Sequence, residues 1–90
     1  MGVHIKPLEV EIDGAGKYRH AETVEDLVKL LMGSSWPEGG KQYHSALWRS
    51  MEALDSVTEA DIARDAFVDA AHEVGMHVLP DDMAEIRKAG

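Results

Sequence analysis

The stretch PLEVEIDGAG, residues 7–16, decides how this chain can fold. Leu8, Val10 and Ile12 alternate with acidic side chains, and a period of two with one polar side predicts a half-buried strand. The Asp-Gly-Ala-Gly run that follows predicts a turn, because glycine adopts positive φ angles without steric cost. We therefore expect residues 17–21 to return as a second strand, which makes the N-terminal part of the chain a β-hairpin.

Apolar residues at helical spacing predict three helices after the hairpin, over residues 23–32, 41–54 and 59–74. Thr23 and Thr58 precede the first and the third helix in sequences that resemble capping boxes. A glycine follows each of these two helices and predicts where it ends. The apolar faces consist of Val24, Leu27, Val28 and Leu31 in the first helix, Tyr43, Leu47, Met51 and Leu54 in the second, with Ala46 and Ala53 nearby, and Ile62, Ala63, Ala66, Phe67, Ala70, Ala71 and Val74 in the third.

The order of these elements predicts an α+β fold in one domain, residues 1–90. Two strands alone are marginally stable, so the hairpin must pack against helices or gain a third strand, for which residues 76–79 are the candidate. Acidic residues after Pro80 predict a short C-terminal helix, with Met83 and Ile86 facing inward. A chain of 90 residues supports one modest core, which agrees with a single domain.

The composition excludes several classes of function. The chain has 9 Lys and Arg residues against 17 Asp and Glu, a net charge of -8, which opposes direct binding to nucleic acid phosphates. It has no cysteine, so a disulfide scaffold, a thiol nucleophile and a thiolate zinc site are excluded. No apolar run is long enough for a membrane helix, and the first residues lack the pattern of a signal peptide. We therefore expect a cytoplasmic protein that contacts neither membranes nor nucleic acid directly.

Several short stretches together resemble one known family. They are PLEV at residues 7–10, WP at 36–37, ARDAFV at 63–68 and AAHEVGM at 70–76. This combination resembles the Domain of Unknown Function 982 family, small proteins found largely in rhizobia and other alphaproteobacteria. The family usually carries a cysteine in its second helix, whereas WRSM at residues 48–51 has none, so no thiol role is implied here. The resemblance implies a fold and a bacterial setting, and it implies no activity.

Motifs that carry catalysis, metal binding or phosphate binding are missing from the sequence. Zinc sites need three or four converging ligands, and the one sterically conceivable set is Asp69, Glu73 and His77. No serine lies in a G-x-S-x-G elbow, and GGK at residues 39–41 lacks the P-loop spacing. We therefore expect no catalytic residue, metal or cofactor.

The most unusual surface feature is a row of carboxylates on the third predicted helix. At four-residue spacing stand Asp61, Asp65, Asp69 and Glu73. Like charges at this spacing cost only about 0.2–0.5 kcal/mol per pair, so the row can be an ordinary solvated face, with Arg64 neutralising part of it. The alternative is a docking face for a basic protein partner, with Trp48 on the second helix as a candidate contact anchor.

These features predict a small non-enzymatic interaction or regulatory module. The first alternative is a small-ligand-binding accessory domain, with a pocket between hairpin and helices near Trp36 and Tyr43. The second alternative is an acidic mimic of nucleic acid that competes for a basic groove. Trp36, in a loop before a proline, is expected mainly to plug the end of the core. We expect a monomer or a weak homodimer, because Pro7 and the charged residues of the hairpin oppose pairing of its edges.

Overall fold

The structure is a computed structural model that describes residues 2–12, 16–33, 36–37, 40–56 and 59–83. In chain order its elements are β1 (His4–Glu11), β2 (Tyr18–Thr23), α1 (Val24–Met32), α2 (Gln42–Asp55), α3 (Ala60–Glu73) and β3 (Val78–Leu79). The predicted hairpin, three helices and short third strand are therefore confirmed.

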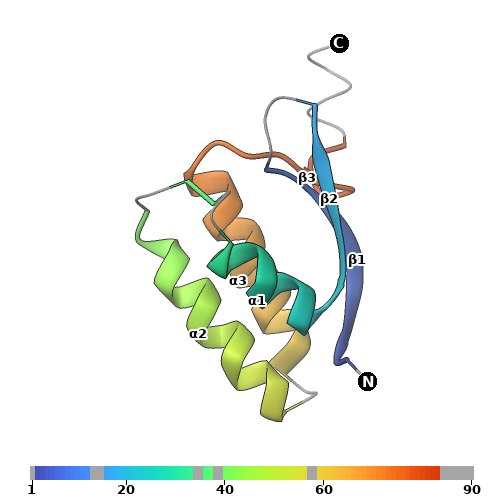
Figure 1. Ribbon diagram of the computed structural model, residues 1–90, viewed down its shortest axis with the longest axis vertical. Helices are drawn as coiled ribbons and strands as arrows, with labels where there is room; N and C mark the ends of the chain where they lie inside the picture. Colours follow the sequence, from blue (N-terminus) through green and yellow to red (C-terminus); the bar gives the residue numbers. More distant parts are fainter. Residues whose placement is uncertain (1, 13–15, 34–35, 38–39, 57–58, 84–90) are drawn as a thin grey trace.

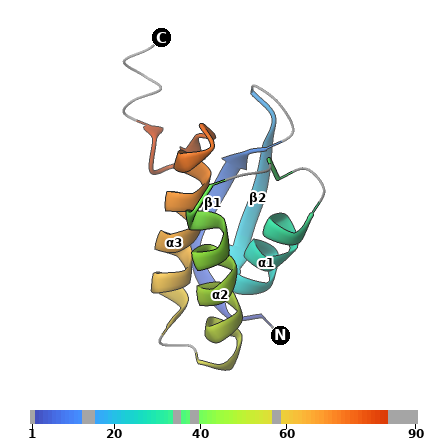
Figure 2. The same cartoon turned by 90° about the vertical axis from the view of Figure 1, so that its left-hand side faces the viewer.

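The molecule is layered, with a sheet on one side and helices on the other (Figures 1 and 2). β1 is the central strand and pairs antiparallel with β2 and β3, in the order β2-β1-β3. α3 packs against β1 and α1 against β2, while α2 lies over both helices on the side away from the sheet (Figure 1). This is the α+β architecture that the sequence predicts.

One face of β1 is buried, as its alternating pattern predicts. Leu8, Val10 and Ile12 all face the helices and are buried. Ile5 is buried as well, although it stands an odd number of residues before Leu8. The pairing of β1 with β2 is irregular between His4 and Leu8, and a one-residue irregularity turns the side chains before it to the other face. Pro7 lies within this irregular stretch, where a missing N–H does least harm to the ladder.

The start of α1 is held by a capping exchange of the predicted kind. The Asp26 N–H donates to Thr23 Oγ1 at 3.2 Å, and the Asp26 carboxylate accepts the Glu22 N–H at 3.1 Å. This second hydrogen bond is the main cause that lowers the pKa of Asp26. At the other end Gly33 follows the helix, but its φ of -73° is not left-handed, so the predicted glycine cap is wrong in its geometry.

The inward face of α2 differs from the prediction. The buried residues are Ala46, Ser50 and Ala53, whereas Met51 and Leu54, which we expected in the core, are 51% and 40% exposed. The small residues lie against α3, which also presents alanines to α2, and small side chains allow two helices to approach closely. The larger apolar side chains are therefore left on the neighbouring, outer side of α2.

The buried face of α3 also differs from the prediction. Phe67 is fully buried, as predicted, but Ile62 is exposed and Arg64 is buried. Arg64 Nε donates to the Lys6 carbonyl at 2.8 Å, and its Nη2 lies 2.8 Å from the Asp81 carboxylate. The prediction that Arg64 neutralises the carboxylate row is therefore wrong, because its long side chain lies toward the edge of the sheet instead.

The end of α3 leads into β3 through Gly75. Gly75 has a φ of +78°, a left-handed conformation that favours glycine, and it ends the helix as predicted. Residues 80–82 form a turn after β3. The predicted cap at Thr58 and the predicted C-terminal helix beyond Met83 lie outside the described residues. Met83 itself is 39% exposed, so the prediction that it faces inward is wrong.

Candidate functional site: an aromatic pocket between α1 and α2

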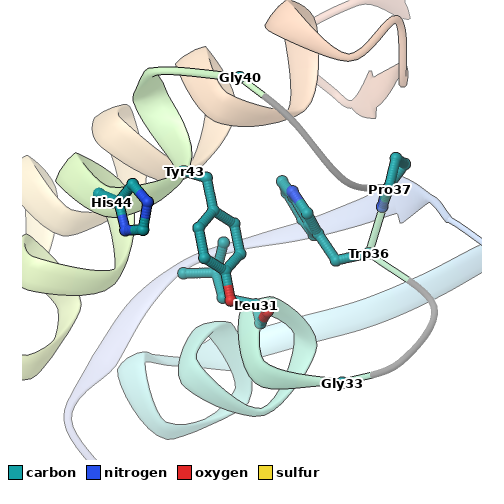
Figure 3. Close-up of a pocket in the computed structure, with 7 residues that line it drawn as sticks. All are labelled: Leu31, Gly33, Trp36, Pro37, Gly40, Tyr43 and His44. Carbon is teal, nitrogen blue, oxygen red and sulfur yellow. Dashed lines mark hydrogen bonds between the residues drawn. The ribbon is translucent and has the colours of Figure 1, made fainter.

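A pocket of about 320 Å³ lies where the chain passes from α1 to α2 (Figure 3). Its lining residues are Leu31, Gly33, Trp36, Pro37, Gly40, Tyr43 and His44. Both residues that the sequence analysis placed in a candidate pocket, Trp36 and Tyr43, belong to this lining. The pocket opens at the end of the helical layer rather than between hairpin and helices, because both sides of its wall come from α1, α2 and their connection.

Aromatic rings form the pocket wall and join it to the core. Trp36 is only 7% exposed, and its ring meets Phe67 edge-on at a centroid distance of 5.3 Å. The Tyr43 ring stands beside it at 6.1 Å with a tilt of 49° (Figure 3). Trp36 therefore closes the end of the core, as predicted, and presents the rest of its surface to the pocket.

One polar side-chain group near the pocket is hydrogen bonded and another is not. The Tyr43 hydroxyl donates to the Leu31 carbonyl at 2.7 Å, which satisfies one of the carbonyls left unpaired at the end of α1. Trp36 Nε1 is buried and has no hydrogen-bond partner; among the described residues only Ser50 Oγ shares this state. Buried indole N–H groups usually have a partner, so this donor is unusual.

The backbone at the mouth of the pocket is fixed by α3. Gly40 has a φ of +93°, and a Cβ on it would collide with the Glu73 carboxylate. That carboxylate accepts the Gln42 N–H at 3.1 Å and so caps the first turn of α2, where Lys41 makes no side-chain cap. The carboxylate thus links the last turn of α3 to the lip of the pocket, a role that sequence spacing alone does not reveal.

The predicted carboxylate row is divided by this contact. Asp61, Asp65 and Asp69 are exposed and have no ion pair with any described residue, while Glu73 caps α2. Trp48 is 66% exposed on α2 and makes no hydrogen bond or ring contact with the carboxylates of α3 in the described part of the chain. The row and the tryptophan therefore lie on neighbouring helices, and no hydrogen bond or ring contact joins them within the described residues.

A polar cluster that the sequence analysis missed surrounds β3. His72 Nε2 lies 2.8 Å from the Asp82 carboxylate, which also accepts the Val78 N–H at 2.6 Å. His77 Nδ1 lies 3.1 Å from a Glu11 carboxylate oxygen. The histidines line a second hollow of about 240 Å³. No local motif could reveal these pairs, because the partners in one of them are 66 residues apart.

The Glu11 carboxylate of this cluster is favoured in its charged form. The Gly16 N–H donates to Glu11 at 2.7 Å and is the main cause that lowers the Glu11 pKa, with His77 as a smaller one. Burial, together with the nearby charges of Glu11 and Asp82, raises the pKa of the Tyr18 hydroxyl.

The metal set considered from sequence does not form. His77 is directed to Glu11, and Glu73 is directed to the first turn of α2. Across the described parts of the chain, no three His, Cys, Asp or Glu side chains gather closely enough to hold a metal ion.

Fold and pocket together define the chain as a small α+β protein with a three-stranded sheet, a helical layer and one aromatic hollow. Residues 6–78 match the model of the family described as "Protein of unknown function (DUF982)", and the chain belongs to that family. The resemblance seen in its short sequence stretches is confirmed. No curated protein and no solved structure matches the chain. Within the described ranges, no helix has the length and apolar character needed to span a bilayer.

Proposed function

We propose that this protein is a small non-enzymatic interaction module that binds a basic, amphipathic segment of a protein partner. The observation that carries the proposal is a row of large apolar side chains on the outer side of α2, the α2 apolar row: Trp48, Met51 and Leu54. Their spacing of three residues places them on successive turns of one side of the helix. Trp and Met are enriched at interface cores, and exposed tryptophans are frequent binding hot spots.

The charge of the chain selects the kind of partner. The net charge is -8, and the uncompensated Asp61, Asp65 and Asp69 lie on α3, which packs directly against α2. Such a negative field attracts a basic partner and speeds its encounter. A segment with one apolar and one basic face would satisfy both surfaces. We also propose a cytoplasmic location, which a cysteine-free composition suits.

The test compares the truncation of two equally exposed apolar side chains that lie on different helices. Trp48→Ala removes the centre of the α2 apolar row, whereas Met32→Ala removes an equally exposed side chain on α1, since both residues are 66% exposed. A partner isolated from the native cell and then purified should bind Trp48→Ala at least about tenfold more weakly and Met32→Ala with unchanged affinity. Asp65→Asn with Asp69→Asn should slow association more than it speeds dissociation.

Three results would contradict the proposal or replace it. Equal affinity of Trp48→Ala and wild type for the purified partner removes the α2 apolar row from the interface. A partner that is acidic at its contact surface contradicts the charge argument. A DNA-binding protein that duplex DNA displaces from the wild-type chain replaces the proposal with the nucleic-acid mimic.

A second candidate function is the binding of a small ligand in the pocket between α1 and α2. The specific observation in its favour is the buried Trp36 Nε1 without a partner, beside a hollow whose lip is fixed by Glu73. A saturable rise of the melting temperature with a small aromatic compound would support it, provided that the rise is lost when the lining is changed, as in Tyr43→Leu.

A further inference from the structure

We infer that Met51 is a reversible oxidation site through which hydrogen peroxide weakens binding at the α2 apolar row. The inference rests on the proposed function and names a regulation of that same surface. Met51 is exposed on α2 and stands between Trp48 and Leu54, three residues from each. A change of polarity at Met51 therefore alters the surface that we propose to contact the partner.

The composition of the chain directs oxidants to methionine. The chain has five methionines and no cysteine, so no thiol of this chain competes for a two-electron oxidant. Met32, Met51 and Met83 are exposed, whereas Met76 is buried in the core. Of the three exposed methionines, Met51 is the member of the α2 apolar row. The chain thus carries an oxidisable residue inside the proposed interface, exposed controls outside it and a buried reference.

The chemistry is the transfer of one oxygen atom to a thioether. The Met51 sulfur attacks one oxygen of hydrogen peroxide, the O–O bond breaks as the S–O bond forms, and the other oxygen leaves as water with both protons. The sulfur loses two electrons and the peroxide gains them. In the reverse step, methionine sulfoxide reductases use a dithiol, which becomes a disulfide while the sulfoxide oxygen leaves as water. The modification is therefore reversible without a cysteine in this chain.

The effect on binding follows from the polarity of the product. A sulfoxide carries a strong hydrogen-bond acceptor, and an apolar partner surface would bury that acceptor without a donor. In the free chain the sulfoxide stays in water, because the Met51 side chain is exposed. Oxidation of Met51 should therefore weaken association and leave the melting temperature of the free protein nearly unchanged.

The experiment treats the chain with hydrogen peroxide and measures both the site and the binding. Mass analysis of peptides should show that Met51 is oxidised about as fast as Met32 and several-fold faster than Met76. The oxidised wild type should bind the purified partner at least about tenfold more weakly. Methionine sulfoxide reductases with dithiothreitol should then restore its affinity.

Three variants assign the effect to one sulfur. Met51→Leu keeps an apolar side chain that peroxide does not oxidise, so peroxide should leave its affinity unchanged. Met32→Leu should remain as sensitive to peroxide as the wild type. Met51→Gln places a polar group at the same position and should bind weakly without any oxidant.

The outcomes separate this inference from the proposed function. Oxidation of Met51 no faster than that of Met76 rejects the site. Full affinity of the oxidised wild type, or equal sensitivity of Met51→Leu and wild type to peroxide, rejects the regulation. In these cases weak binding by Trp48→Ala leaves the interface in place. Full affinity of Trp48→Ala rejects the interface itself, and the inference fails with it.

Discussion

The two sides of α3 are held by different kinds of interaction. Toward α2, the contact consists of alanines, Phe67 and the ring of Trp36, and it is apolar. Toward the edge of the sheet, Arg64 and His72 reach across to Asp81 and Asp82, and the contact is ionic and hydrogen bonded. The first contact depends on filled volume, whereas the second depends on charge state and on the position of individual atoms. The two sides should therefore fail under different perturbations.

The ionic side of α3 supports a short element, the strand β3 and the turn that follows it. β3 has only two residues, which pair with Glu9 and Val10 of β1. Its turn is closed by the Asp82 N–H, which donates to the Val78 carbonyl at 2.7 Å, and by the Asp82 carboxylate, which accepts the Val78 N–H. A strand of two residues makes too few hydrogen bonds to be stable without these contacts. We therefore expect this end of the molecule to open locally before the helical core does.

Phe67→Ala should have the largest effect, because it empties the centre of the apolar side. Phe67 is fully buried, and such truncations cost about 3–5 kcal/mol. Urea unfolding measures this loss. The control is Ile62→Ala on the same helix, where a 46% exposed side chain should cost well under half as much. Similar losses for the two variants would mean that the orientation of α3 is wrong.

Arg64→Met should come next, because it keeps the buried stem and removes the charge. The hydrogen bonds to Asp81 and the Lys6 carbonyl are lost, which we expect to cost about 1.5–3 kcal/mol, typical of bonds to charged groups. Amide exchange at Val78 should quicken more than exchange in α2. Arg49→Met is the control, since Arg49 makes only an exposed pair with Glu52 and should cost about 0.5 kcal/mol or less.

Acid should act on the ionic side first. The hydrogen bond and charge of Arg64 lower the pKa of Asp81 in the folded protein. A carboxylate with a lowered folded pKa contributes stability above its unfolded pKa of about 3.9, and the contribution disappears as pH falls through the folded pKa. The stability difference between wild type and Asp81→Asn should thus be constant above about pH 5 and shrink in acid. The same difference measured in an Arg64→Met background should be small at every pH, and a full-sized difference there would contradict the assignment.

Ser50→Ala should be a smaller change of opposite sign. Ser50 is fully buried on α2, and within the described residues its hydroxyl has no hydrogen-bond partner. Removing that hydroxyl should stabilise the apolar side by about 1 kcal/mol, through relief of desolvation and better helix propensity. Ser45→Ala, on the exposed side of the same helix, reports the propensity contribution alone. A destabilised Ser50→Ala would show that the hydroxyl has a partner in solution.

Substitutions in the carboxylate row should change stability least, and the sign of the change should depend on whether the carboxylate caps α2. Glu73→Ala should cost about 0.5–1 kcal/mol, because it removes the cap of α2. Asp65→Asn combined with Asp69→Asn should leave stability unchanged or raise it by about 0.2–0.5 kcal/mol, through relief of repulsion. Thermal unfolding of both variants in one buffer compares them. Loss of stability in the double variant would show that these aspartates also make native bonds.

The elements of this fold follow from local patterns, while their facing sides do not. Alternation predicts β1 and periodicity predicts the helices, because each signal lies within a few turns of chain. On α2, however, Met51 and Ala53 both satisfy a helical pattern. Which of them is buried depends on the small residues that α3 presents. Arg64 illustrates the same limit, since its partners lie 58 and 17 residues away.

In the candidate site, too, the sequence predicts individual residues but not the long-range contacts between them. Trp36 and Tyr43 can be proposed from sequence, because aromatic residues in or beside a Pro-containing loop often close the end of a hydrophobic core. The caps and pairs that complete the site cannot be proposed in this way. Glu73 contacts Gln42 across 31 residues, and Trp36 Nε1 is unpaired because the folded chain brings no acceptor to it among the described residues.

The edge of β1 beyond β3 has a consequence for how copies of this chain avoid aggregation. Where β3 ends, a bare strand edge would be a template on which other chains could add strand after strand, as in amyloid. Here Pro7 has no N–H to offer, and Arg64 already occupies the Lys6 carbonyl. The buried Arg64 thus stabilises the folded state and also blocks a backbone acceptor to which another chain could bind. Arg64→Met should therefore shorten the lag time of aggregation as well as lower the free energy of unfolding.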